Sequence, residues 1–76
     1  MQHLKTGKLI GENIRRVRNA RGLTQKELAE QLQLEDLDLS RGTVAKIESG
    51  IRHITLDELK IIKKVLKMDY SDFFED

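Results

Sequence analysis

Cysteine, proline and tryptophan are absent from the 76 residues, and aromatic residues make up only 4% of them. Without cysteine the chain has no disulfide framework and no thiolate metal site. Long apolar runs are also missing, since none approaches the roughly 20 residues that a helix needs to cross a bilayer. The first residues lack the apolar segment of a signal peptide. We therefore expect a cytoplasmic protein without a membrane segment.

The sequence offers little from which to build a catalytic or metal site. His3 and His53 are the only histidines, far apart and without carboxylates at the spacing of metal ligands. Ser40 and Ser49 lack a nucleophile elbow, and Gly7–Lys8 lacks the rest of a phosphate loop. We expect no enzyme activity, no metal, no cofactor and no small-molecule ligand.

What the chain does contain is typical of a small helical domain. Leucine, isoleucine, glutamate and lysine are common, and a chain of this length buries only about 60% of its unfolded surface, so close helix packing has to stabilise it. We predict an all-α fold, with residues 1–7 as a flexible N-terminal arm and residues 8–76 as one domain. We also take these residues as the whole protein rather than the N-terminal half of a larger regulator.

The net charge of +1 hides an uneven distribution. Residues 1–26 hold seven Lys/Arg and one acid, residues 27–40 hold five acids and no base, and residues 41–67 hold seven bases and three acids. Two basic blocks would suit contact with phosphates. Charge segregation alone, however, is more typical of an ordinary solvated surface.

The stretch from Thr24 to Gly50 predicts two short helices. Thr24 can cap the first helix, with Glu27 three residues later to complete a capping box. Ser40 can cap the second, and Gly50 suits the left-handed turn after its last residue. The segment between them, residues 33–39, is acidic. We expect its leucines to pack against the core while its acids face water, and these residues are Leu34, Leu37, Leu39, Glu35, Asp36 and Asp38.

The second of these helices has two different faces. At about 100° per residue, Ser40, Thr43, Val44 and Ile47 share one side, and Arg41, Gly42, Ala45, Lys46 and Ser49 share the other. The second set combines long cations with small residues, so the backbone could approach a partner closely. The major groove of DNA admits such a helix, and Arg or Lys can bind guanine edges there. We predict that residues 40–49 bind the major groove.

A charged pair is predicted between the first helix and this one. Ile10, Ile14 and Val17 form an apolar stripe that Gly22 ends, and Arg18 lies at the edge of the stripe. Glu48 occupies the same kind of edge position in the second helix. A partly buried charge needs a partner, so we predict an Arg18–Glu48 pair; separate solvation of the two side chains is the alternative.

A further helix is expected after Thr55, with Glu58 completing a second capping box. Leu56, Leu59, Ile62 and Leu66 line one side of it, and Asp69 begins a last helical turn. The remaining apolar residues exceed what a single contact requires. We expect them in the core or in a dimer interface, the sequence leaving both open, and they are Ile61, Val65, Tyr70, Phe73 and Phe74.

The order of these motifs resembles the lambda-repressor-like, Cro-type helix-turn-helix proteins, also called the xenobiotic-response-element family. The segments that carry the resemblance are IGENIRRVRNARGLTQKELAEQL, SRGTVAKIESG, TLDELKIIKKVL and DYSDFF, which cover nearly the whole chain. The resemblance implies a compact bundle of five helices in which the second and third bind DNA. The connection between those two is about five residues longer than the usual short turn.

The resemblance also implies roles for individual residues. Arg41, Gly42 and Lys46, with Ala45 on the same face, fall at positions that contact bases. Gln25, Thr43, Ser49 and Arg52 fall at positions near phosphates, and Arg18 and Glu48 match a buried structural pair. Ile51 stands where relatives often have lysine, and Gly42 where they often have a longer side chain.

We therefore predict a sequence-specific DNA-binding transcriptional regulator, a repressor by expectation, that binds a palindromic operator as a homodimer. The alternative is an antitoxin-like or anti-repressor module that uses the same fold to bind a protein.

Overall fold

Local capping signals define the helices of the computed structural model, which describes residues 6–76. These residues form four α-helices, α1 (Thr6–Ala20), α2 (Gln25–Leu34), α3 (Arg41–Glu48) and α4 (Leu56–Leu66), followed by the 3-10 helix η2 (Tyr70–Phe74). The all-α prediction is confirmed for this part of the chain. The fifth predicted helix is the 3-10 helix η2.

The predicted N-caps are present. The Thr24 and Thr55 hydroxyls accept hydrogen bonds from the N–H groups of Glu27 and Glu58, at 3.0 and 3.2 Å, and both glutamates complete their capping boxes. The Ser40 hydroxyl accepts from the Thr43 N–H at 3.1 Å. Each cap satisfies main-chain donors that the first turn would otherwise leave unpaired.

The four α-helices end in the same way, with a residue in the left-handed conformation. These residues are Gly22, Asp36, Gly50 and Lys67, with φ angles of 74°, 64°, 83° and 56°. In each case the N–H group of the next residue bonds back to a carbonyl in the last turn, as Leu37 does to Leu32 at 3.0 Å. This is the Schellman arrangement, which turns the chain sharply after each helix.

Two predicted boundaries are wrong. Thr6 and Gly7 belong to α1, so they are not part of the predicted arm. The rest of that arm, residues 1–5 including His3, lies outside the described residues. α2 continues to Leu34, and the connection to α3 is therefore residues 35–40. Because Leu34 follows Leu32 by two helical positions, it points away from the core and is 83% exposed, against prediction.

In the connection between α2 and α3, Asp36 and Asp38 face solvent as predicted, whereas Glu35 is half-buried and pairs with Lys64 at 2.7 Å.

The core is built from one face of each α-helix, from this connection and from the C-terminal segment. The buried hydrophobic residues are Ile10, Ile14, Val17, Leu28, Ala29, Leu32, Leu39, Val44, Ile47, Leu59, Ile62, Leu66, Met68 and Phe73.

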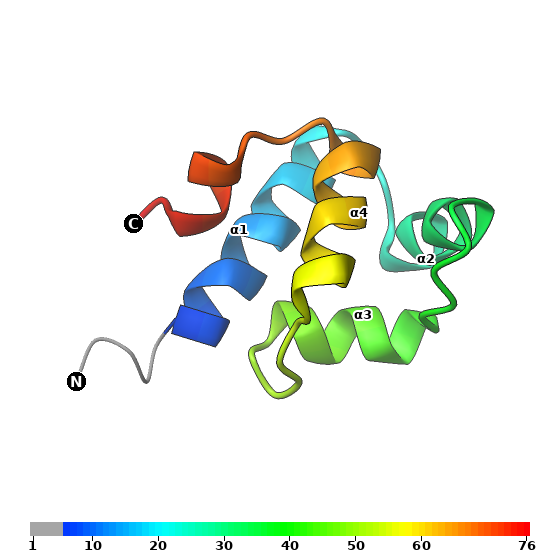
Figure 1. Cartoon of the computed structure of the whole chain (residues 1–76), viewed down its shortest axis with the longest axis horizontal. Coiled ribbons are helices and arrows are strands. Elements are labelled where there is room, and N and C mark those ends of the chain that lie inside the picture. Colours follow the sequence, from blue (N-terminus) through cyan, green and yellow to red (C-terminus); the bar gives the residue numbers. More distant parts are fainter. Residues whose placement is uncertain (1–5) are drawn as a thin grey trace.

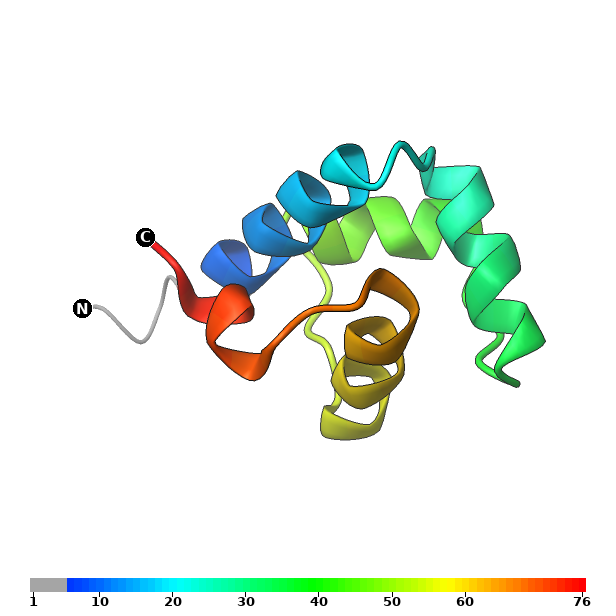
Figure 2. The same ribbon diagram turned by 90° about the horizontal axis from the view of Figure 1, so that it is seen from above.

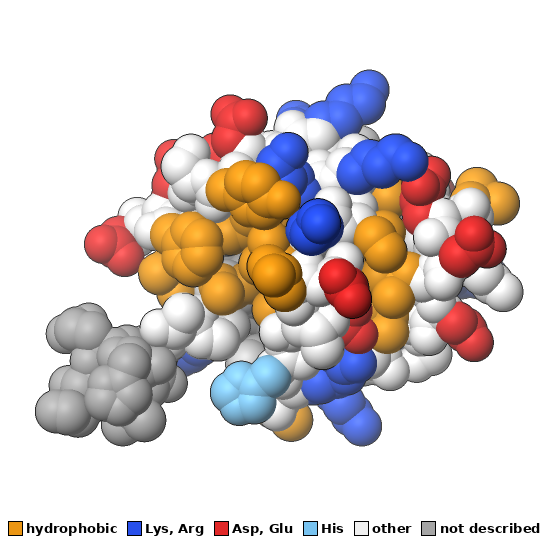
Figure 3. Space-filling view, in the orientation of Figure 1, with side chains coloured by type: hydrophobic (Ala, Val, Ile, Leu, Met, Phe, Trp, Pro, Cys, Tyr) orange, Lys and Arg blue, Asp and Glu red, His pale blue; other side chains and the backbone are white. Residues whose placement is uncertain are grey.

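The apolar residues of α4 and η2 are divided between core and surface. Phe73 is completely buried, and Ile61 and Val65 are partly buried against the core. Tyr70 and Phe74 remain about half exposed. Leu56, predicted on the same side of α4 as the buried Leu59, Ile62 and Leu66, is 72% exposed. Figure 3 shows hydrophobic side chains gathered over α4 and η2 on this face.

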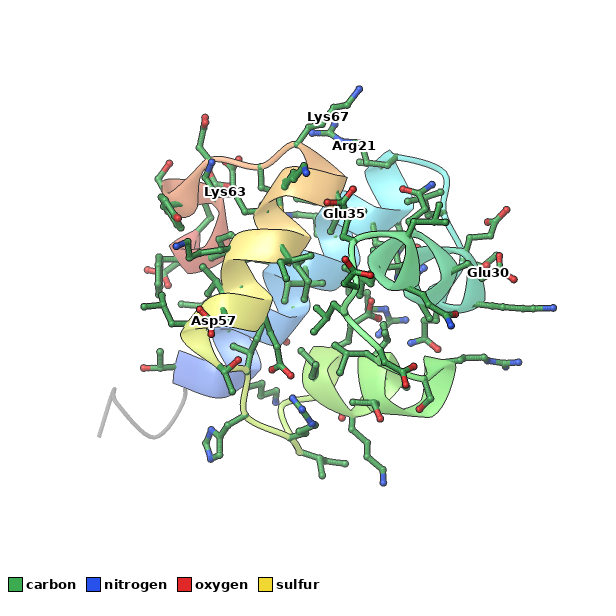
Figure 4. The ribbon with its side chains drawn as sticks, turned by 45° about the vertical axis from the view of Figure 1, so that its right-hand side comes forward. Arg21, Glu30, Glu35, Asp57, Lys63 and Lys67 are labelled. Carbon is green, nitrogen blue, oxygen red and sulfur yellow. The ribbon has the colours of Figure 1, made fainter. Side chains whose placement is uncertain are left out.

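The C-terminal segment returns to α1. The Asn13 side-chain amide donates to the carbonyls of Phe73 and Glu75, both at 2.8 Å, and Arg16 pairs with Glu75 at 3.1 Å. Figures 1 and 2 show η2 beside α1. Just after α1, Arg21 donates to the carbonyls of Leu66 and Lys67, which places it over the C-terminus of α4 (Figure 4).

α3 lies along one edge of the molecule, with α1, α2 and α4 all on the same side of it (Figure 1). The arrangement leaves one side of α3 open to solvent.

Each described helix is too short or too polar to cross a membrane.

Two glycines allow α1 and the end of α3 to approach closely. A Cβ atom at Gly11 would overlap the carbonyl oxygen of Ile47 and would lie 2.6 Å from that of Glu48. A Cβ at Gly50 would lie 2.9 Å from the Cα of Lys8. The absence of side chains at both positions thus sets the distance between α1 and α3.

Gly11→Ala should destabilise the fold by about 1–3 kcal/mol, because the added methyl group must push α3 away from α1. Gly7→Ala is the matched control in the same helix, since its Cβ would meet only His53, at 3.6 Å. Urea denaturation measures both. Equal stability of the two variants would contradict the proposed role of Gly11.

Candidate nucleic-acid interface

The open side of α3 carries most of the residues predicted to contact bases. Arg41, Gly42, Lys46 and Ser49 are exposed, and Ala45 is half-buried at the edge of the same face. Val44, Ile47 and Glu48 are buried on the opposite side. α3 is thus anchored through one face, and the other face is free for a partner.

An ion pair anchors the buried face. The predicted Arg18–Glu48 pair is present, with Arg18 Nε and Nη2 donating to the two Glu48 carboxylate oxygens at 2.6 and 3.0 Å. The exposed fractions of the two side chains are 8% and 3%. Arg18 Nη1 also donates to the Leu23 carbonyl at 2.7 Å. Bidentate geometry and the additional acceptor offset the loss of hydration.

Gln25 takes part in the same network. Its Nε2 donates to Glu48 Oε1 at 3.0 Å, so the carboxylate receives hydrogen bonds from α1 and from α2. The family resemblance implied a phosphate contact for this side chain. In the structure the Gln25 side chain also helps to hold α3, and its amide keeps a second N–H group for a partner.

Arg52 has a partner that the sequence did not predict. Its Nη1 and Nη2 donate to Glu58 Oε1 and Oε2 at 2.9 and 2.8 Å, and Nη1 also donates to the His53 carbonyl. The hydrogen bonds to the Glu58 carboxylate raise the pKa of Arg52, and burial opposes this. Glu58 therefore has two roles, as the capping-box residue of α4 and as the counter-ion of Arg52. Sequence analysis had identified only the first.

The two remaining predicted phosphate contacts are also hydrogen-bonded within the chain. The Thr43 hydroxyl lies 3.0 Å from the Ser40 hydroxyl, and the Ser49 hydroxyl donates to the Lys46 carbonyl at 3.1 Å. In contrast, no hydrogen bond or ion pair involves the Arg41 or Lys46 side chain within residues 6–76. The long cations of the open face are available to an external partner.

Gly42 lies in this open face without any steric need for glycine. A Cβ there would meet only the Ser40 hydroxyl, at 3.9 Å. No contact within the fold therefore requires glycine at this position. The absence of a side chain lets the backbone of α3 come close to whatever the open face binds.

Two cations near this face were missed by sequence analysis. Arg15 and Lys26 line a hollow together with Arg41, Arg18, Thr24 and Gln25. Arg15 is one helical turn before Arg18, and Lys26 follows Gln25, so both lie next to residues that the sequence had singled out. Their short distance in sequence from Arg18 and Gln25 could have identified them as neighbours of the predicted site.

Comparison with known proteins agrees with this geometry. A family model described as Helix-turn-helix matches residues 14–73. The chain belongs to the helix-turn-helix family. The match confirms the resemblance to lambda-repressor-like, Cro-type proteins inferred from the sequence motifs.

A solved structure is similar over nearly the whole helix-turn-helix chain. The restriction-modification controller protein C.AhdI from Aeromonas hydrophila superposes with a TM-score of 0.81 at 26% sequence identity, over 97% of this chain and 100% of that one. Comparison with curated protein sequences gives no significant match. The family and the fold together support a DNA-binding transcriptional regulator.

Arg18→Met should destabilise the helix-turn-helix domain by about 3–5 kcal/mol, because it leaves the Glu48 carboxylate buried without its counter-ion. The double variant Arg18→Met/Glu48→Leu should recover most of that loss, since no unpaired charge remains. Chemical denaturation followed by circular dichroism compares the three proteins. If the double variant is no more stable than the single one, the unpaired charge is not the cause.

A second prediction concerns pH. Hydrogen bonds from Arg52 hold the pKa of Glu58 below its ordinary value of 4.5, burial opposes this, and the Thr55 N–H adds to the lowering. A lowered folded-state pKa stabilises the fold above the unfolded pKa, and this stabilisation is lost as the pH falls through the folded value. The melting temperature of the wild type should therefore fall more steeply than that of Glu58→Gln at pH values below about 4.5. Parallel curves would show that the carboxylate is not the responsible group.

Proposed function

We propose that the protein is a sequence-specific regulator that inserts the open face of α3 into the major groove of double-stranded DNA. The supporting observation is the division of α3 into a face locked by Glu48 and a face whose cations, Arg41 and Lys46, have no partner within the described chain. Arg and Lys bind guanine O6 and N7 in the major groove. Ala45 and Gly42 would contribute close contact, including contact with thymine methyl groups.

The predicted phosphate contacts flank this face. Thr43 lies in the first turn of α3 and Ser49 is its C-cap, and their hydroxyl groups keep lone pairs or hydrogens for further bonds. Gln25 would contact a phosphate through the amide N–H that Glu48 leaves free. Arg52 would contribute through the donors that Glu58 leaves free, since a guanidinium has five N–H groups.

We further propose that two copies bind together. The surface formed by Leu56, Tyr70 and Phe74 is the apolar part of α4 and η2 that the fold leaves exposed, and Lys63 lies over the Tyr70 ring at 4.9 Å. A second copy would cover this surface and place two α3 helices about one turn of DNA apart, which matches a palindromic operator. Binding at such an operator would repress a promoter that overlaps it. The restriction-modification controller protein is a precedent for a regulator with this fold.

The alternative, a module that binds only protein, has less support. Such a module would bind through the apolar residues Ile61, Val65, Phe73 and Phe74. Phe73 is completely buried, and Ile61 and Val65 pack against the core. Salt separates the two functions. Binding to DNA weakens steeply with ionic strength because counterions are released, whereas binding through apolar residues responds much less.

Selection from a random pool of DNA duplexes should yield a palindromic site that binds two chains. On this site Lys46→Ala should cost about 1–3 kcal/mol and should lower discrimination at one base position in each half-site. Lys67→Ala is the matched control, because Lys67 lies at the C-terminus of α4, on the far side of the molecule from α3 (Figure 4). Equal affinities of the two variants in a fluorescence-anisotropy titration would refute base contact by Lys46.

A further inference from the structure

The arginines of the chain differ in whether they have a partner. Four of the six donate hydrogen bonds to carboxylates, side-chain amides or main-chain carbonyls, and these are Arg16, Arg18, Arg21 and Arg52. Arg15 and Arg41 have no such bond within residues 6–76. Both are exposed, one on α1 and the other on α3.

These two unpaired arginines line the same hollow. It lies where α1, the start of α2 and the start of α3 meet, and its lining is Arg15, Arg18, Thr24, Gln25, Lys26 and Arg41. Four of the six lining residues are cations, and none is an acid. Glu48 neutralises Arg18 from behind the lining, so Arg15, Lys26 and Arg41 remain without a compensating charge.

Helical register explains why these side chains converge. Arg15 precedes Arg18 by three positions, which puts both on one side of α1. Arg41 precedes Glu48 by seven positions, which is about 20° short of two full turns, so Arg41 lies at the border between the open face and the buried face of α3. Arg41 therefore lies at the edge of the open face next to the hollow, whereas Gly42 and Lys46 lie farther around the helix.

We propose that this hollow binds one phosphate group of the DNA backbone, with Arg15 and Lys26 as its side-chain ligands and Arg41 at its border with the base-contacting face. The proposal deepens the proposed function and rests on it. Three like charges around one concave surface repel one another, and a phosphate removes that repulsion while accepting several charge-assisted hydrogen bonds. The position of the hollow beside α3 selects the DNA backbone as the source of the phosphate.

Arg15 thereby acquires a role outside the two helices of the helix-turn-helix pair. Because a phosphate contact carries no sequence information, Arg15 should add affinity equally on the selected site and on DNA of mixed sequence. Its contribution should also depend on salt, since each phosphate contact changes the slope of log affinity against log salt by about 0.9.

The test compares Arg15→Gln with Arg15→Lys and with Lys67→Gln, a control that removes one positive charge on the far side of the molecule. Affinity is measured on the selected duplex and on a mixed-sequence duplex over a range of salt concentrations. Arg15→Gln should make the fall of log affinity with log salt less steep by about 0.9 for each bound chain. For each chain this corresponds to roughly eightfold weaker binding at about 0.1 M salt. The ratio of the two affinities should not change. Arg15→Lys should keep most of the slope, and Lys67→Gln should keep all of it.

Several outcomes would overturn the proposal. An Arg15→Gln slope equal to that of the wild type or of Lys67→Gln would show that no phosphate contact is lost. A change in the ratio between selected and mixed DNA would assign Arg15 to a base. If the wild type itself bound DNA without salt dependence, the proposed function would fail as well. The wild-type measurement thus tests the proposed function, and the comparison with Arg15→Gln tests the phosphate contact. Thermal melting of Arg15→Gln checks the fold and should match the wild type, because the side chain is exposed and unpaired.

Discussion

The buried contact between Arg18 and Glu48 determines how α3 is held, and the use of its open face depends on it. One carboxylate receives hydrogen bonds from α1 through Arg18 and from α2 through Gln25, so three helices meet at a single charged group. An apolar contact at this position could slide or rotate, whereas a bidentate pair has one geometry. We interpret the pair as a device that fixes orientation more than one that adds stability, because buried pairs gain little over apolar packing.

Steric fit completes the same constraint at the other side of the contact. Gly11 and Gly50 bring the end of α3 against α1 so closely that a methyl group at either position would meet main-chain atoms. The ion pair fixes the rotation of α3, and the two glycines fix its distance from α1. Together they present Arg41, Gly42 and Lys46 on a surface that the rest of the fold does not cover.

Features set by residues close in sequence could be predicted, and features set by distant neighbours could not. Thr24 with Glu27 and Thr55 with Glu58 lie three positions apart, so their capping boxes follow from the sequence alone. The Arg18–Glu48 pair could be predicted because both residues occupy edge positions of apolar stripes. Leu34 was assigned wrongly because the end of α2 depends on the left-handed residue Asp36, which carries no clear sequence signal.

The candidate site shows the same division. The face of α3 follows from helical spacing, whereas the partner of Arg52 and the convergence of Arg15 on Arg41 depend on how α1, α2 and α4 are placed in space. A list of cations cannot separate those that are paired within the fold from those that are free. In the structure Arg52 is paired with Glu58, whereas Arg15 has no partner within the described residues, which makes Arg15 the better candidate for a contact with DNA.

The empty space beside Gly42 has a consequence for how the protein could change. Because the fold makes no use of this position, larger residues can be introduced there without disturbing the contacts that hold α3. Under the proposed function, a new side chain there would enter the major groove and alter which bases are preferred. Divergence among paralogues, or a laboratory library randomised at this one codon, could therefore retarget the protein while its scaffold stays the same.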